Sequence, residues 1–416
     1  MTPGPERPER PAIERRLAEA GLPALPRWAW LELDLDALRG NLAVVRELAG
    51  SGVPVRPVVK ADAYGHGAVP ITLALEAAGA DGFCVAAFDE ALELREGGVA
   101  APILVLYPVS GAWAVDAARL GIALAAGDGP GVSDIVGAAA GIDPARPLTV
   151  ELEVETGLGR GGFVEEELVA AARVLAGTPG IALTGLWTHF QAIEDAANTD
   201  AQVGRFEAAV RALAEAGIDL PPRHAAASAG LMTGGVLAYD GVRPGLAIYG
   251  LVPDEIDEAA AREGAAARLR PVMSLIARPV RVADLPAGWG VSYGPTFRTA
   301  RPSRIATLPI GYGDGWSRRL SNRASAIVRG RLVPLVGNVA MDAVMADVTD
   351  VPGPPVDGTD EFVLLGLSGD ARITAEALAR ERTTNTWEVV TGMARRVPRV
   401  YHAAARPVGL RTLTER

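Results

Sequence analysis

The feature that most constrains how this chain folds is a regular alternation of short apolar runs with Ala-, Leu- and Glu-rich segments between residues 54 and 250. Several of the runs are apolar nearly throughout, which is typical of parallel strands covered on both faces. The alternation occurs eight times, as a closed (β/α)₈ barrel requires. An open doubly wound sheet is the alternative that the pattern leaves open. The eight runs are PVRPVVK, GFCVAAF, PILVLY, IALAAGD, LTVELEVE, LTGLWTHF, RHAAAS and the run ending GLAIYG.

One further run, WLELDLD, precedes these eight and alternates apolar with polar residues, which indicates a half-buried strand. Because the barrel already has eight strands, we expect this one to pair elsewhere. Asp36 is expected to cap the next helix, which carries Leu38 and Leu42 on its apolar face and ends near Gly50. A short helix is also expected over residues 11–20.

The pattern changes near residue 265, where strand-like runs joined by Gly- and Pro-containing turns replace the alternation. These runs predict a second domain with one helix over Thr374–Arg382. The expected fold is therefore α/β, an N-terminal (β/α)₈ TIM-like barrel followed by a C-terminal mainly-β domain. The predicted borders are a flexible N-terminal extension over 1–27, the barrel over 28–265 and the β domain over 266–416.

Composition excludes several classes of protein. Apolar residues make up 49% of the 416 residues and charged residues 22%, which excludes disorder or a coiled coil as the main architecture. A net charge of −10 argues against a nucleic-acid partner and against an anionic membrane surface. The single cysteine, Cys84, excludes an intrachain disulfide and a thiolate-rich zinc site, and we predict no metal. With no apolar stretch of membrane-spanning length and no secretory signal, the chain is expected to be cytoplasmic.

The strongest local signal is VVKADAYGHG at residues 58–67. Lys60 ends a predicted parallel strand, and barrel enzymes place their active sites at the carboxyl ends of their strands. A lysine there could form a Schiff base with a carbonyl cofactor, or it could simply extend its charge to solvent. Gly65 and Gly67 would let the backbone turn closely beside Tyr64.

This segment resembles the cofactor-lysine signature of the alanine racemases, a pyridoxal-phosphate-dependent family with a barrel domain followed by a β domain. Other segments resemble the family in the same order, from about residue 28 to the C-terminus. The resemblance implies interconversion of L- and D-alanine, which supplies D-alanine for peptidoglycan, with pyridoxal 5′-phosphate as cofactor. The further segments are TGLGRGGF, WTHF, GVRPGLAIYG, GVSYGPTF, LPIGYGDGW, VGNVAMDAVMADVT and RRVPRVY.

Two catalytic residues follow from the resemblance. Lys60 would hold the cofactor aldehyde and then serve as one acid/base, and Tyr293 in GVSYGPTF would act from the opposite face. Both are needed because a proton removed from one face of Cα must return to the other for inversion. In the family this tyrosine belongs to the partner subunit, which implies a homodimer with shared active sites.

The resemblance also implies two residues beside the cofactor ring. His189 in WTHF would contact the ring and assist the tyrosine, and Arg243 would face the pyridine nitrogen. A guanidinium stays protonated, so it would leave that nitrogen unprotonated and weaken the ring as an electron sink. This should favour racemization over transamination. Judged by residue type alone, the histidine could belong to the core and the arginine to a surface ion pair.

The remaining implied site residues bind the cofactor phosphate or the amino-acid substrate. The expected phosphate ligands are Tyr64, the hydroxyl of Ser228, the N–H groups of Gly245 and Leu246, and Trp387. The expected substrate contacts are Arg160, the N–H of Met341, and Tyr312 from the second subunit, with Glu153 and Asp342 in supporting positions.

Five positions depart from the family pattern. Glu153 stands seven residues before Arg160, where many members have a lysine that becomes carbamylated. Glutamate presents a carboxylate without modification, so we expect it to orient Arg160 through a charge-assisted hydrogen bond. Trp387 replaces a phosphate-binding tyrosine but keeps an N–H donor. The other departures are Ala227, which replaces an asparagine, and Asn338 and Ala340 beside the substrate.

Other activities remain open from the sequence. A racemase of the same family could act on serine or another small amino acid. A fold-related decarboxylase fits less well, because such enzymes usually place an acidic group at the ring nitrogen, where this chain has Arg243. A non-catalytic carrier of pyridoxal phosphate would not need the second domain that bears Tyr293 and Met341.

Overall fold

The computed structural model describes residues 11–233, 237–254, 256, 264 and 266–414. The chain divides into two compact units, residues 37–270 and residues 1–36 together with 271–416. We call them the barrel unit and the β unit. The division differs from the predicted borders, because it assigns residues 28–36 to the β unit. Of the predicted extension, residues 1–10 lie outside the described part of the chain, and so does residue 265 at the predicted domain border.

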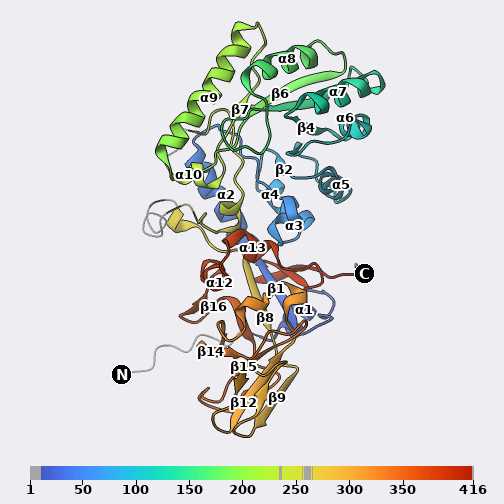
Figure 1. The fold of residues 1–416 in the computed structure, drawn as a ribbon. Helices are drawn as coiled ribbons and strands as arrows, with labels where there is room; N and C mark the ends of the chain where they lie inside the picture. Colours follow the sequence, from blue (N-terminus) through green and yellow to red (C-terminus); the bar gives the residue numbers. More distant parts are fainter. Residues whose placement is uncertain (1–10, 234–236, 255, 257–263, 265, 415–416) are drawn as a thin grey trace. The chain divides into compact units, whose positions relative to one another are not determined.

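The barrel unit is built on parallel strands in sequential order, β2-β3-β4-β5-β6-β7. Neighbouring strands pair in parallel register, for example Cys84 with Leu104, because each is reached through a helix that crosses over the sheet. The helices α5 to α8 lie outside the strands (Figure 1). The strands are β2 (Phe83–Val85), β3 (Ile103–Val105), β4 (Ile122–Ala126), β5 (Leu148–Glu153), β6 (Ile181–Trp187) and β7 (Arg223–His224). The helices are α4 (Ala68–Ala77), α5 (Phe88–Glu96), α6 (Ala114–Leu120), α7 (Gly129–Ala138), α8 (Glu165–Ala176), α9 (Ala196–Glu215) and α10 (Ser228–Met232).

Two further segments close this sheet into a ring. Residues 54–59 form parallel bridges on both sides, Val58 with Cys84 of β2 and Val55 with Val242. The ring is completed beside β7, where the Asp240 N–H donates to Arg223 O at 2.8 Å. The first run forms isolated bridges rather than a continuous ladder, because Pro54 and Pro57 have no N–H to donate. The predicted barrel is confirmed.

The eighth run is a strand segment only in its first part. The run ending GLAIYG was expected to be a strand, but its last residues, Leu246–Tyr249, form a 3₁₀ helix, and residues 240–244 before them take the place of the eighth strand. The physical reason is local: the Ser228 hydroxyl accepts the N–H groups of Gly245 and Ala247 at 3.0 and 3.1 Å. These donors are therefore withdrawn from any strand ladder, and the chain turns instead.

The β unit contains an eleven-stranded sheet whose long path runs β19-β18-β1-β8-β16-β13-β14-β15-β12-β9, with β17 paired to β16. Except for the parallel pair of β1 and β18, its neighbours are antiparallel, as expected for runs joined by tight turns. The strands are β1 (Ala29–Asp34), β8 (Met273–Ala277), β9 (Arg281–Leu285), β12 (Ser303–Leu308), β13 (Ser325–Val328), β14 (Arg331–Val336), β15 (Val344–Asp347), β16 (Phe362–Ser368), β17 (Ala371–Ile373), β18 (Arg399–Ala403) and β19 (Arg406–Arg411). A small hairpin, β10 (Gly290–Val291) with β11 (Phe297–Arg298), precedes β12.

Strand β1 and the helix after it follow the prediction, with one correction. Strand β1, formed by the WLELDLD run, lies outside the barrel and pairs with β8 and β18 in the β unit, as expected. The next helix, α2 (Leu35–Ala49), is capped by Asp34 rather than Asp36, because the Asp34 carboxylate accepts the Asp36 N–H at 2.9 Å. The Asp36 carboxylate accepts the Ala404 N–H at 2.6 Å instead.

Part of the predicted N-terminal extension is packed. Helix α1 (Ile13–Glu19) lies where a helix was expected, and its Ile13 and Leu17 side chains are fully buried. Arg16 forms a buried ion pair of 2.8 Å with Glu32 of β1. Burial of two large aliphatic side chains and an ion pair is incompatible with a flexible tail over these residues.

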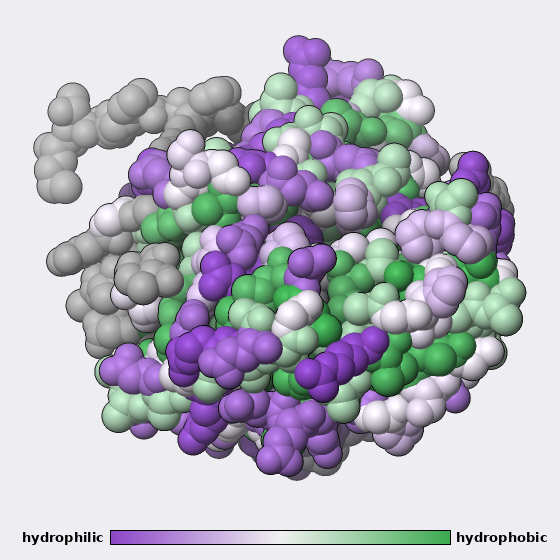
Figure 2. All heavy atoms as spheres, turned by 90° about the horizontal axis from the view of Figure 1, so that it is seen from above, coloured by the Kyte–Doolittle hydropathy of each residue, from purple (hydrophilic) through white to green (hydrophobic). Residues whose placement is uncertain are grey.

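The helix expected over Thr374–Arg382 is α12 (Ala375–Arg382), with the Thr374 hydroxyl accepting the Ala377 N–H at 3.1 Å as its cap. In the described part of the chain, no helix is long and apolar enough to cross a membrane. The face shown in Figure 2 carries apolar and hydrophilic residues side by side, which is usual because even a folded protein exposes much apolar surface.

Candidate active site

Lys60 lies in the barrel unit, directly after residues 54–59, at the carboxyl end of the first strand segment. It begins α3 (Lys60–Tyr64), in which Ala61, Asp62, Ala63 and Tyr64 all have φ between 52° and 57°. This is a left-handed turn, which costs an ordinary residue about 1 kcal/mol or more. The predicted turn at Gly65 is present, with φ 79°, but the left-handed backbone begins four residues earlier.

Two side chains hold this left-handed turn in place. The Glu90 carboxylate of α5 accepts the Ala61 N–H at 2.6 Å. The His66 ring contacts the carbonyl oxygens of Ala63 and Tyr64, both at 2.9 Å from Nδ1. Because carbonyl oxygens only accept, Nδ1 carries the proton. Neither Glu90 nor His66 was assigned this role from the sequence, although His66 lies within VVKADAYGHG.

The cationic groups of the barrel unit act on one another. Burial, followed by the charge of Arg160, lowers the pKa of the Lys60 amine. Burial and the charges of Arg243, Arg160 and Lys60 lower the pKa of His189 to about 3, so this imidazole is neutral at neutral pH. Such mutual effects require proximity. The charges of Lys60, Arg160 and Arg243 therefore reach His189, and all four residues follow the carboxyl ends of strand segments of the barrel unit.

Arg243 is buried, with 3% of its surface exposed, and burial lowers its pKa to about 10. Its Nη2 donates to Thr188 O at 2.7 Å, and its Nη1 donates to His224 O at 2.9 Å and contacts His224 Nδ1. The guanidinium carbon also lies 4.8 Å from the centre of the Trp187 ring. Among the described residues, none accepts a hydrogen bond from Arg243 Nε. Both terminal nitrogens are thus held by protein, and one donor is left for a ligand.

A chain of interacting polar and charged groups runs inward from Arg243. His224 Nε2 lies 2.6 Å from Glu151 Oε2, and Glu151 Oε1 lies 2.6 Å from Arg56 Nη1. Burial opposes ionisation of Glu151, but the His224 ring and Arg56 outweigh it and hold its pKa at about 2. Burial lowers the pKa of His224, so the ring is neutral. Neutral His224 donates from Nε2 to Glu151 and accepts at Nδ1 from Arg243.

A tight cradle surrounds the predicted phosphate ligands. A Cβ on Gly245 would lie 2.5 Å from the Tyr64 hydroxyl oxygen, so only glycine allows this approach. The Tyr64 ring is placed by the Tyr249 ring, 4.9 Å away between centroids. Ser228 Oγ accepts two backbone N–H groups, one of them from Gly245, and its own proton is left to donate. Contrary to expectation, the Gly245 N–H is therefore engaged within the protein. Leu246 begins the 3₁₀ helix and is buried.

The loop that carries Arg160 leaves the carboxyl end of β5. The Glu155 carboxylate accepts the N–H groups of Gly157 and Gly159, the latter at 2.9 Å, which shapes the turn before Arg160. Arg160 Nη2 lies 3.5 Å from Glu153 Oε1, which is within ion-pair distance but longer than the charge-assisted hydrogen bond that the sequence suggested. Burial raises the pKa of Glu153 above its ordinary value. Ala227, another departure, stands at the N-cap of α10 and has no side chain to cap it.

The second group of predicted residues lies in the β unit, on exposed loops. Tyr293 is 75% exposed, Met341 54% and Tyr312 43%. Asn338 of the departure segment donates from its amide to Tyr293 O at 2.8 Å and to Gly294 O at 3.3 Å. The loop bearing the predicted catalytic tyrosine is therefore held by Asn338, one of the positions that depart from the family pattern.

The same loops fix Tyr312 and Met341 relative to each other. The Tyr312 N–H donates to Ala340 O at 3.1 Å, and the Gly313 N–H donates to Met341 O at 2.9 Å. Asp342 forms an ion pair of 2.6 Å with Arg396. The Asp342 and Asp314 carboxylates raise the pKa of Arg396.

Trp387 lies in α13 (Thr386–Thr391), where its carbonyl accepts the Thr391 hydroxyl proton at 2.7 Å. The predicted site residues thus divide between the two units. In the barrel unit they are Lys60, Tyr64, Glu153, Arg160, His189, Ser228, Arg243, Gly245 and Leu246. In the β unit they are Tyr293, Tyr312, Met341, Asp342 and Trp387.

Sequence reasoning missed the buried pair of His224 and Glu151. His224 stands in RHAAAS, which was used only for Ser228, and Glu151 stands two residues before Glu153 on β5. Strand alternation places Glu151 and Glu153 on one face, so two acids on the interior face of a predicted barrel strand were an available signal. Gly185 on β6 supports this pair, because a Cβ there would lie 2.5 Å from the Glu151 side chain.

Comparisons with known proteins cover both units. Residues 33–253 match the family model described as "Alanine racemase, N-terminal domain", and residues 272–401 match "Alanine racemase, C-terminal domain". An alanine racemase from Symbiobacterium thermophilum is 41% identical over 382 residues, with 90% of this chain and 97% of the relative covered. One from Halothermothrix orenii is 37% identical, with 91% and 97% covered.

Solved structures agree over nearly the whole chain. The alanine racemase of Bacillus anthracis with bound L-Ala-P superposes with a TM-score of 0.86 at 32% identity, covering 94% of this chain and 99% of that one. The alanine racemase of Streptomyces coelicolor A3(2) gives a TM-score of 0.81 at 35% identity, covering 92% and 99%. The barrel, the β unit and the order of the motifs agree with this likeness, and the chain belongs to the alanine racemase family.

Proposed function

We propose that this protein is an alanine racemase that interconverts L- and D-alanine with pyridoxal 5′-phosphate as cofactor. The observation that carries the proposal is the group of Lys60, Arg160, His189 and Arg243, whose charges act on one another at the carboxyl ends of the barrel strands. That edge is where barrel enzymes place their chemistry. The family match over both units supports the same assignment.

The barrel unit has donors that fit the cofactor. The Tyr64 hydroxyl lies so close to Gly245 that any side chain at position 245 would clash with it. The Ser228 hydroxyl accepts two N–H groups and can donate its own proton to a phosphate oxygen. Arg243 Nε is the donor left for the pyridine nitrogen, because its terminal nitrogens are held by His224 and Thr188. Tyr64, Ser228, Leu246 and Trp387 would hold the phosphate and Lys60 the aldehyde, while Gly245, whose N–H donates to Ser228, would leave space beside the phosphate.

Pyridoxal phosphate supplies an electron-withdrawing ring that makes the Cα–H of a bound amino acid acidic. The lowered pKa of Lys60 favours the neutral amine, the form that can accept a proton at Nζ. Tyr293 would hold or release the second proton at its hydroxyl oxygen. Neutral His189 would assist this tyrosine and contact the ring.

The substrate would be oriented by its carboxylate. Arg160 is placed by the Glu155-braced loop and by Glu153, and it carries the charge that a carboxylate needs. The N–H of Met341 and the side chain of Tyr312 would complete the substrate site, with Asp342 in support through Arg396.

We also propose that the protein is a homodimer with composite active sites, because Tyr293 and Tyr312 are exposed on the β unit, where a partner could receive them. Sedimentation equilibrium should give twice the chain mass of 43.1 kDa. A cytoplasmic location, with D-alanine delivered to peptidoglycan synthesis, belongs to the same proposal and is supported by the family membership.

The deciding experiment offers the L-isomers of alanine, serine and lysine to the cofactor-loaded protein and measures the D-isomers by chiral chromatography. Alanine should be racemized fastest. Lys60→Ala should abolish both the reaction and the absorbance of the bound cofactor, and Tyr293→Phe should abolish the reaction while cofactor absorbance persists. Faster conversion of serine would replace alanine as the substrate, and retained turnover in Tyr293→Phe would contradict the two-residue assignment.

A further inference from the structure

A pocket lies at the opposite end of the barrel strands from Lys60. Its volume is about 580 Å³, within the range of small-molecule sites. The lining comes from segments that enter β3, β4 and β5, including Pro102, Gly121 and Pro147, so the pocket lies at the amino ends of these strands. No residue proposed for racemization lines it.

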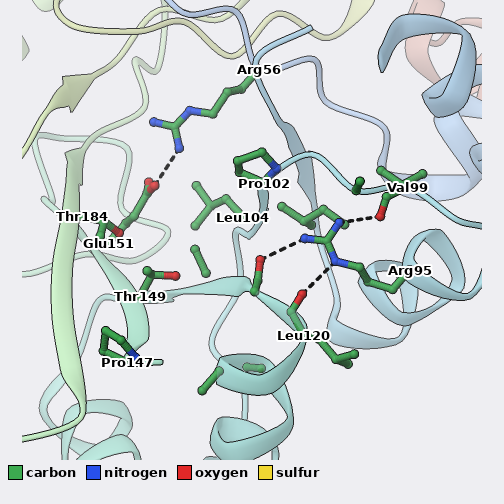
Figure 3. A pocket seen from close by; sticks show the side chains of 16 residues that line it. Arg56, Arg95, Val99, Pro102, Leu104, Leu120, Pro147, Thr149, Glu151 and Thr184 are labelled. Atoms are coloured by element: carbon green, nitrogen blue, oxygen red, sulfur yellow. Dashed lines mark hydrogen bonds and ion pairs between the residues drawn. The ribbon is translucent and has the colours of Figure 1, made fainter. Parts of the chain in front are cut away.

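Most of the pocket wall is apolar. Figure 3 shows Leu104 between the two arginines, Arg56 and Arg95, which approach the pocket from different sides. The remaining apolar wall is formed by Val99, Ala100, Ile103, Ala117, Ala118, Leu120 and Ala123. A wall of this kind takes a hydrocarbon chain rather than a sugar or a nucleotide, which needs polar partners along its whole length.

The charged groups of the pocket differ in what they can still bind. Arg95 donates to the carbonyl oxygens of Leu120 and Val99 at 2.9 and 2.8 Å, and to two further carbonyl oxygens, so its donors are largely used. Arg56 uses only Nη1, on Glu151, among the described residues. Its side chain is 17% exposed, and its remaining donors are available to a ligand.

The net charge of the residues that line the pocket favours an anionic ligand. Arg56 and Arg95 bring two positive charges to the lining, whereas Glu151 brings one negative charge, and both of its oxygens are already bound by His224 and Arg56. Thr184 adds a buried hydroxyl that has no hydrogen-bond partner among the described residues. A group with one negative charge and two acceptor oxygens matches the free edge of a guanidinium.

We propose that this pocket is a ligand site for a small monocarboxylate with an apolar chain, whose carboxylate binds Arg56 and whose chain packs against Leu104, Ala118 and Ala123. The site is separate from the substrate site and does not depend on the proposed racemization. Arg56 also pairs with Glu151, the inner end of the chain that leads through His224 to Arg243. A carboxylate bound in the pocket therefore lies beside Arg56, which is linked through Glu151 and His224 to Arg243.

The test titrates the cofactor-loaded protein with hexanoate by isothermal calorimetry. Saturating alanine is present so that it occupies the substrate site, and heat from hexanoate binding there is not measured. Hexylammonium supplies the same chain with the opposite charge, and acetate supplies the charge without the chain. We expect hexanoate to bind about tenfold or more tightly than either probe, because each lacks one of the two recognised features. Equal affinities for hexanoate and hexylammonium would overturn the proposal.

Variants locate the binding. Ala118→Phe and Ala123→Leu should each weaken hexanoate binding about tenfold, because the added side chain occupies the pocket. Val115→Phe, on the same helix as Ala118 but outside the lining, should bind hexanoate as the parent does. Arg56 is left intact because its loss would free Glu151 as an unpaired buried charge. Circular dichroism shows which of the two variants, Ala118→Phe and Ala123→Leu, keeps the parent's fold. If a variant that keeps the fold binds hexanoate as tightly as the parent does, the proposal is overturned.

Discussion

His224 Nε2 lies 2.6 Å from Glu151 Oε2, and this pair determines the state of the ring that meets Arg243. A guanidinium only donates, so His224 Nδ1 must accept, and the single ring proton must lie on Nε2, where Glu151 takes it. Glu151 thus selects the tautomer that lets a neutral ring bind Arg243. It also compensates the charges of the buried Arg243 and the partly buried Arg56.

The first prediction concerns Glu151 and stability. Glu151→Gln should lower the free energy of unfolding by about 3 kcal/mol, because it leaves buried cations without their counter-charge. Urea denaturation of the cofactor-free protein measures this. Glu166→Gln, an exposed acid in the first turn of α8, serves as the matched control and should change stability by less than about 0.5 kcal/mol. A loss in Glu151→Gln no greater than in the control would contradict the buried charge chain.

The second prediction concerns pH. Burial lowers the pKa of His189 to about 3 and lowers the pKa of His224, so the folded state binds fewer protons than the unfolded state below pH 6.5. Their contribution to stability is complete above pH 6.5 and is lost as the pH falls toward the folded pKa values. Each histidine should contribute a slope of about 1.4 kcal/mol per pH unit in that window. Chemical denaturation between pH 7.5 and 5 checks this, and a flat profile would show that the rings are not held neutral.

The third prediction concerns Asn338, which holds the backbone of Tyr293. Asn338→Ala should lower kcat about tenfold with a smaller effect on KM, because the loop that carries the tyrosine loses two hydrogen bonds. Asn338→Asp should be worse than alanine, because its carboxylate would face two carbonyl oxygens. Steady-state kinetics of both variants tests the order. If the aspartate variant is as active as the parent, the amide does not position Tyr293.

The fourth prediction concerns Glu153. Glu153→Gln should raise KM for alanine several-fold with less effect on kcat, because Arg160 loses an ionic partner at 3.5 Å but keeps its own charge. Glu166→Gln again provides an exposed control on a neighbouring element. Unchanged KM and kcat in Glu153→Gln would show that Glu153 is an ordinary strand acid.

The periodicity of apolar runs predicted the barrel well, but it could not distinguish strand from 3₁₀ helix at GLAIYG. That distinction depends on Ser228, seventeen residues earlier, whose hydroxyl takes the N–H groups that a strand would need. The cap of α2 was assigned to Asp36 instead of Asp34 for a related reason. Both aspartates have side chains suitable for a cap. Only the fold shows that the Asp36 carboxylate accepts the N–H of Ala404, near the C-terminus, and that Asp34 therefore caps the helix.

The sequence by itself determined the two-part architecture, the turn after Lys60 and the residues proposed for racemization, because local alternation and ordered motifs are properties of short segments. Only the tertiary structure decided which buried polar groups meet. Arg56, Glu151, His224 and Arg243 come from separate strands of the ring, and nothing in their spacing announces that they form one chain. Closing the barrel removes them from water together, and in that low-dielectric interior each charge requires the partner that the fold provides.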